Sequence, residues 1–181
     1  LAEDTEVRKN APAEAPINSV RPTLMGNILV DMSKSNDPEL ATKKVIDALK
    51  LIEKFPKYHG FVQKWLSGIS SGMRSGVNLE SGNYVISDVV VLKQSIEWIA
   101  STIYHDSIHP WQYKTGGDGP YKGDRDMETP ANLRQIEFLK AVGAPLRYIK
   151  HIEATIAKGN HSDLNGDGIY DWKDWELRNY E

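Results

Sequence analysis

Two histidines one helical turn apart are the residues of this chain whose spacing most clearly suits chemistry. They belong to the stretch Tyr-His-Asp-Ser-Ile-His at residues 104–109. Residues four apart on a helix project from the same face, close enough for two imidazoles to bind one metal ion. Because the chain contains no cysteine, a zinc site here has to be built from histidine and carboxylate groups. His105 and His109 are therefore the first candidates for metal ligands.

The acidic residue after the first histidine gives the stretch the form H-D-x-x-H. It resembles the H-E-x-x-H motif of zinc metallopeptidases, with Asp106 at the position of the glutamate. Further along, Glu128 opens the sequence Glu-Thr-Pro-Ala, which is similar to the downstream E-x-x-A of the gluzincin group. The resemblance covers roughly residues 83–142. It implies an α+β fold, mostly helical and zincin-like, with a small antiparallel sheet.

The resemblance also implies a role for each residue. His105, His109 and Glu128 would bind Zn²⁺ and leave a fourth position for water, whose pKa the ion lowers to about 7. Asp106 would act as general base and then deliver the proton to the leaving amine. The substrate would be a peptide or a peptide-like amide. Asp124 and Asp126 remain alternatives to Glu128 as the third ligand.

A second hypothesis follows from the aspartate. Its carboxylate lies roughly 1.5 Å further from a water placed for glutamate, because aspartate is one methylene shorter. General-base geometry tolerates a misplacement of only about half an ångström. The chain would then be a catalytically inactive, zincin-like module that binds metal. A third hypothesis is an interaction or adaptor protein whose function depends only on the C-terminal calcium segment.

The C-terminal residues 163–174 form a second motif, Asp-Leu-Asn-Gly-Asp-Gly-Ile-Tyr-Asp-Trp-Lys-Asp. Its spacing resembles an EF-hand loop that closes with aspartate, as dockerin-type loops do, and it predicts a structural Ca²⁺ site. Such loops fit a secreted or periplasmic protein. The predicted calcium ligands are Asp163, Asn165, Asp167, the carbonyl of Ile169, Asp171 and Asp174.

Composition limits the classes of partner. The 181 residues carry a net charge of −3, so nothing indicates a nucleic acid or an anionic membrane as partner. We also expect no membrane span, because no apolar run reaches the required length of ~18 residues. The length suits one domain. We expect a flexible leader behind a removed signal peptide at 1–22, the metal-binding domain at 23–160 and the calcium segment at 161–181, packed on the same domain.

Several elements precede the motif. A short apolar run at 27–30 is either a strand or a docking segment. Asp37 and Pro38 predict the start of a helix, and residues 57–69 carry apolar residues at helical spacing. The stretch 67–82 is rich in glycine and serine and predicts a turn-rich connection. Residues 83–87 predict a strand, either the edge on which an extended peptide pairs or part of a plain two- or three-stranded sheet.

The remaining elements must position the candidate ligands. A helix capped by Ser87 and Asp88 buries an isoleucine-rich stripe and turns both histidines away from it. Pro110 predicts that this helix ends or kinks at His109. Asp126 is expected to cap the next helix, which carries Glu128 and stops at Gly143. A last helix runs over 145–158. Glu128 would then form the opposite wall of a cleft at the histidines.

Overall fold

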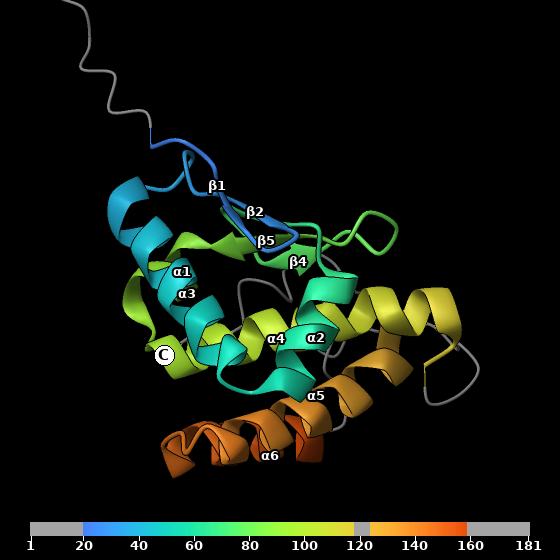
Figure 1. Cartoon of the computed structure of the whole chain (residues 1–181). Coiled ribbons are helices and arrows are strands. Elements are labelled where there is room, and N and C mark those ends of the chain that lie inside the picture. The colour runs from blue at the N-terminus through green and yellow to red at the C-terminus, as the bar shows by residue number, and fades with distance from the viewer. Residues whose placement is uncertain (1–19, 118–123, 159–181) are drawn as a thin grey trace, which may run out of the picture.

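The computed structural model describes residues 20–117 and 124–158, with the backbone alone at 124–126. Within these residues the fold is mixed α/β, with six helices and one five-stranded sheet (Figure 1). The predicted leader falls largely in residues 1–19, and all the predicted calcium ligands fall in 159–181. Residues 1–19 of the leader and all the predicted calcium ligands therefore lie outside the described residues. None of the helices in the described ranges is long and apolar enough to cross a bilayer.

The sheet is mixed, so the prediction of an antiparallel sheet is wrong. Its strand order is β1-β2-β3-β5-β4, in which β2, β3 and β5 are parallel and the two outer strands are antiparallel to their neighbours. Two helices stand between β2 and β3 in the chain, and a crossover of this kind returns the chain to the same end of the sheet. The strands are β1 (Thr23–Met25), β2 (Ile28–Asp31), β3 (Gly68–Gly72), β4 (Gly76–Val77) and β5 (Asn83–Ser87).

The glycine-rich segment 67–82 contains β3, the central strand, where a connection was predicted. Gly68 shows why a small residue stands there. A Cβ at this position would lie 2.7 Å from the Asn83 side-chain oxygen and 3.3 Å from the Leu29 carbonyl oxygen. A side chain here would displace the Asn83 side chain and would need the Leu29 carbonyl group to move by a few tenths of an ångström. Glycine has a low preference for strands, so the sequence did not predict β3 here. Its small size nevertheless lets β3 fit between β2 and β5.

The first two helices agree largely with expectation. The Asp37 carboxylate accepts a hydrogen bond of 3.0 Å from the Leu40 N–H and caps α1 (Pro38–Glu53). Helix α2 (Pro56–Trp65) begins with a proline at its first position. Residues 57–69 are not all helical, because α2 ends at Trp65 and Ile69 belongs to β3.

The single helix predicted from Ser87 onwards is two helices. Ser87 caps α3 (Asp88–Lys93), and Ser95 caps α4 (Ile96–Thr115). The backbone is extended at Gln94 between them. The Lys44 ammonium group donates hydrogen bonds of 3.0 and 2.7 Å to the carbonyl oxygens of Leu92 and Gln94. A partly buried amine from α1 therefore satisfies carbonyl groups at the break.

Helix α4 does not end at His109. It continues through Pro110 to Thr115, where Gly116 adopts the left-handed conformation at φ 78° and closes the helix. Proline in a helix interior costs about 3 kcal/mol. That cost is offset by packing, since α4 contacts α1, α2, α5 and the sheet along its length. The extra turn after Pro110 keeps Gln112 on the helix.

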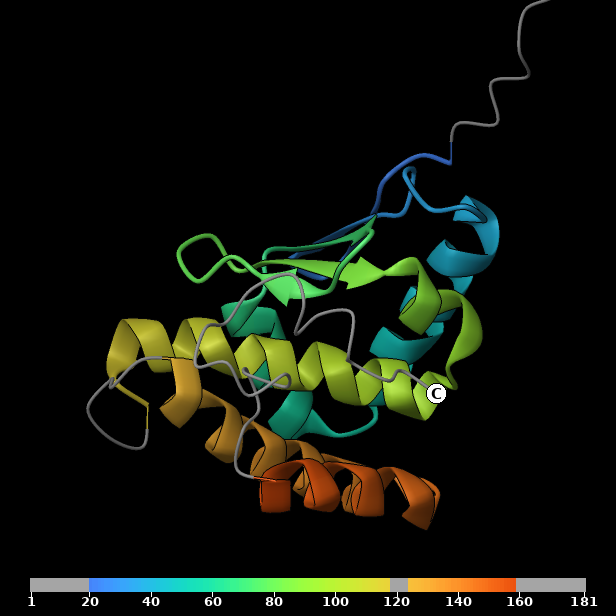
Figure 2. The same ribbon diagram turned by 180° about the vertical axis from the view of Figure 1, so that it is seen from behind.

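The helices lie on one side of the sheet, with α4 central and α5 and α6 beneath it (Figures 1 and 2). The strands direct Ile69, Tyr84 and Ile86, which are at most 1% exposed, into the core between sheet and helices. Helix α5 (Asp124–Ala141) buries Ala131, Phe138 and Leu139. Helix α6 (Leu146–Lys158) packs on α5 in a smaller cluster. The main layers thus hold α4 between the sheet and α5.

Candidate metal centre

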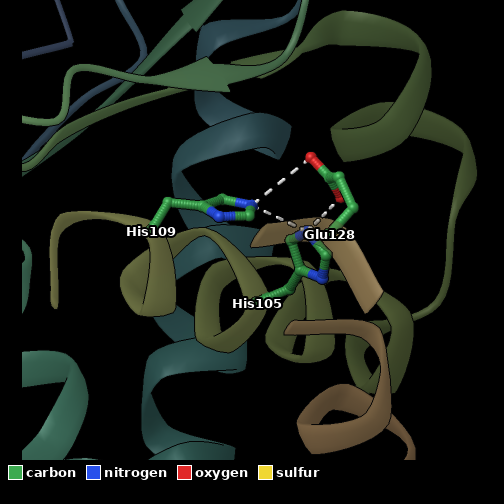
Figure 3. Close-up of side chains that lie close together, drawn as sticks. All are labelled: His105, His109 and Glu128. Carbon is green, nitrogen blue, oxygen red and sulfur yellow. Dashed lines mark hydrogen bonds and ion pairs between the residues drawn. The ribbon is translucent and has the colours of Figure 1, made fainter. Parts of the chain in front are cut away.

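Side chains from α4 and α5 converge at one point between the two helices. The Nε2 atoms of His105 and His109 are 3.1 Å apart (Figure 3). Glu128 places one carboxylate oxygen 3.3 Å from His105 Nε2 and the other 3.6 Å from His109 Nε2. The three residues predicted as ligands are therefore brought together, and the group could hold a metal ion.

The electrostatics of the cluster favour a cation. A neutral imidazole nitrogen that lacks a proton carries a lone pair, and a carboxylate is negative. The three side chains are only 13%, 10% and 26% exposed for His105, His109 and Glu128. Electron-rich atoms at these separations, with little water to screen them, require a proton or a metal ion between them.

Gln112 links the two helices beside the cluster. Its side-chain oxygen lies 3.0 Å from His109 Nδ1, and its side-chain nitrogen donates a 3.0 Å hydrogen bond to the Met127 carbonyl oxygen. The sequence interpretation missed Gln112 because it ended the helix at His109. Gln112 follows His109 by three residues, so the two side chains share a face if the helix continues past Pro110. This spacing could have identified Gln112.

Asp106 lies beside the three candidate ligands and is not part of their cluster. It accepts a hydrogen bond from Tyr84, which comes from β5 and is 1% exposed. Burial is the main cause that raises the pKa of the Asp106 carboxyl group above its usual range, and Glu128 raises it further, while His105 and His109 oppose the rise. No local pattern could have identified Tyr84, since its contact depends on how the sheet packs on α4.

The strand at 83–87 was predicted correctly, but both interpretations of its sheet are wrong, because β5 is not a sheet edge and the sheet has five strands. Strand β5 pairs with β3 on one side and with β4 on the other. The edge strand beside β5 is the two-residue β4, which packs against α4, and the opposite edge is β1. Residues 78–82 reverse the chain direction between β4 and β5, so the two strands form a hairpin. In this hairpin β4 pairs with the side of β5 that faces away from β3.

The rival ligands lie at the start of α5. That helix begins at Asp124, two residues before the expected cap, so Asp126 lies inside the helix and does not cap it. The side chains of Asp124 and Asp126 lie outside the described residues.

Comparisons of the chain with protein-family models, with curated proteins and with solved structures found no match.

Proposed function

We propose that this chain is a zinc-dependent hydrolase of peptides or peptide-like amides, in a zincin-like fold. The observation that carries the proposal is the spacing of the donor atoms. Ligand atoms around a tetrahedral ion with bonds of 2.0–2.1 Å are about 3.3 Å apart. The two histidine Nε2 atoms are 3.1 Å apart, and the Glu128 carboxylate faces them with separate oxygens, Oε2 at 3.3 Å from His105 and Oε1 at 3.6 Å from His109. With one ligand atom from each residue, all three atoms lie within 4.8 Å of one another.

The composition of the ligand set supports zinc and an open position. Two imidazoles and one carboxylate are a donor set of catalytic zinc sites, which keep a fourth position for water or substrate. When bound, zinc supplies a Lewis acid that polarises a carbonyl oxygen and lowers the pKa of water. The partial exposure of Glu128 suits access from solvent to that position.

Asp106 would be the group that transfers a proton from water to the leaving amine. It accepts a proton from the attacking water and delivers it to the nitrogen of the leaving amine. In the metal-free chain, burial raises the pKa of this carboxyl group above its usual range. Tyr84 orients the carboxylate by donating a hydrogen bond to it from its hydroxyl group.

The same hydrogen bond favours a second candidate, an inactive zincin-like module that binds metal. The carboxylate of Asp106 is short, and the buried Tyr84 hydroxyl already occupies one of its acceptor positions. An acid held in this way reaches less far toward a substrate than a glutamate would. This candidate keeps the zinc site and loses turnover.

Elemental analysis and a peptidase assay distinguish the candidates. We expect about one zinc per chain in the wild type and little in His105→Ala, His109→Ala or Glu128→Ala. His151→Ala is the matched control, because His151 is exposed on α6 and lies beside Trp98. Equal zinc in all five proteins would refute the metal site. Zinc without cleavage of a broad peptide library would favour the inactive module.

A further inference from the structure

We propose that Gln112 is a positioning residue of this metal centre. It sets which ring nitrogen of His109 carries the proton, and it ties the backbone next to Glu128 to α4. The inference rests on the proposed function, because it assigns a role in building the same zinc site.

The hydrogen bonds around Gln112 leave one consistent arrangement of protons. The Met127 carbonyl oxygen can only accept, so the amide nitrogen of Gln112 must face it, as it does at 3.0 Å. The amide oxygen then faces His109 Nδ1 at 3.0 Å. Since this oxygen can only accept, Nδ1 must carry the ring proton.

The tautomer has a direct consequence for metal binding. In the neutral ring with its proton on Nδ1, the Nε2 atom of His109 presents its lone pair. That atom lies 3.1 Å from His105 Nε2 and 3.6 Å from Glu128 Oε1. An imidazole binds a metal through the nitrogen that lacks a proton, and the bond made by the other nitrogen decides which one that is. Gln112 thus prepares His109 as a ligand.

The second bond of Gln112 acts on the other helix. Met127 directly precedes Glu128 in α5, so the hydrogen bond to its carbonyl oxygen holds the third ligand's backbone against α4. Gln112 is 6% exposed, and water therefore cannot easily replace either bond. One buried side chain joins a ligand on α4 to the backbone beside a ligand on α5.

The chain contains a matched control for this role. Gln135 is 4% exposed and also links α4 and α5, because its side-chain nitrogen donates a 2.9 Å hydrogen bond to the Ser101 hydroxyl oxygen. Its partner is a serine and not a ligand. Gln135→Leu therefore reports the structural effect of losing a buried amide between these helices.

Zinc affinity tests the proposal in the full chain, by competition with a chromogenic chelator. We expect Gln112→Leu to bind Zn²⁺ roughly 10- to 100-fold more weakly than the wild type, the usual range for a lost outer partner of a ligand. Gln135→Leu should bind it as the wild type does. Gln112→Glu keeps an acceptor for the Nδ1 proton, so its affinity should lie closer to the wild type than to Gln112→Leu.

A second measurement needs no metal. Long-range ¹H–¹⁵N spectra of the metal-free chain report the protonated ring nitrogen of each histidine, and the His109→Ala spectrum assigns His109. We expect the Nδ1–H form in the wild type, in Gln135→Leu and in Gln112→Glu, and its loss in Gln112→Leu. Wild-type affinity in Gln112→Leu, an unchanged tautomer in that variant, or an equal loss of affinity in Gln135→Leu would each overturn the role of Gln112. A wild-type chain that binds no Zn²⁺ would overturn the proposed function and this inference together.

Discussion

The Tyr84 hydroxyl of the sheet hydrogen-bonds the Asp106 carboxylate of helix α4. The strand β5 therefore holds the acid that stands next to the first histidine of the cluster. Burial of the phenol raises the pKa of Tyr84 well above its usual range, so the hydroxyl keeps its proton and remains a donor at neutral pH. The position of the candidate base is set jointly by the sheet and the helix.

Tyr84→Phe should shift the pH dependence of Asp106. The lost hydrogen bond stabilised the ionised carboxylate, so the pKa of Asp106 should rise further. Any activity that needs the carboxylate should then have its acidic limb at higher pH. Carbon NMR of the Asp106 carboxyl group measures the shift directly, with Tyr58→Phe as a control for loss of a buried phenol on α2. An unmoved or lowered pKa would contradict the role assigned to Tyr84.

Asp106→Asn should separate turnover from stability. We expect hydrolysis to fall by about 10² or more, the scale for removing a positioned base, while zinc content stays unchanged. The metal-free protein should become more stable at neutral pH. The folded-state pKa of Asp106 is raised, so folding becomes less favourable as pH rises through the ordinary value of about 3.9 and towards the folded value.

Thermal unfolding in a chelator at several pH values checks this second effect. The unfolding free energies of Asp106→Asn and the wild type should differ at pH values above the folded-state pKa of Asp106. The difference should vanish well below its unfolded-state pKa. Loss of zinc from Asp106→Asn would instead make Asp106 a ligand.

Zinc should stabilise the folded chain through the cluster. At a free concentration 100 times the dissociation constant, an ion that binds only the folded state adds about 2.7 kcal/mol. For a chain of this size that corresponds to a rise in Tm of roughly 5–10 °C. Calorimetry with and without Zn²⁺ should show the rise in wild type and in His151→Ala, and its absence in His105→Ala. A rise in all three would place the stabilising ion elsewhere.

Calcium removal tests the C-terminal motif. Asp163, Asp167 and Asp174 cluster negative charge that a cation would neutralise. We expect a calcium-selective chelator to lower Tm in wild type, and Asp167→Ala to remove this dependence without changing zinc content. An identical melting curve in excess chelator would argue against a structural calcium ion.

Local spacing was sufficient to predict the ligand cluster. His105 and His109 share a helix face whatever the rest of the chain does, and the downstream motif identified Glu128. Gln112 and Tyr84 were not predicted, because the first depends on packing that carries α4 past Pro110 and the second on the contact between sheet and helix.

Strand β3 was not predicted either, for a related reason. Its sequence Gly-Ile-Ser-Ser-Gly has little intrinsic preference for a strand. The space between its neighbours decides its residues instead, as Gly68 shows. The two helices and the capping residue Asp37 at the start of the domain, by contrast, follow from local signals and were predicted.

The separation of His109 and Glu128 along the chain also bears on the order of folding. An ion held by both would cross-link a loop of about twenty residues. A covalent link of that length reduces the conformational entropy of the unfolded chain, which stabilises the folded state by about 3 kcal/mol at 25 °C. The parallel pairing of Leu29 with Gly68 spans a longer stretch that includes two helices. Contacts close in sequence form faster than distant ones. We therefore expect contacts between α4 and α5 to form before the parallel pairing of β2 with β3.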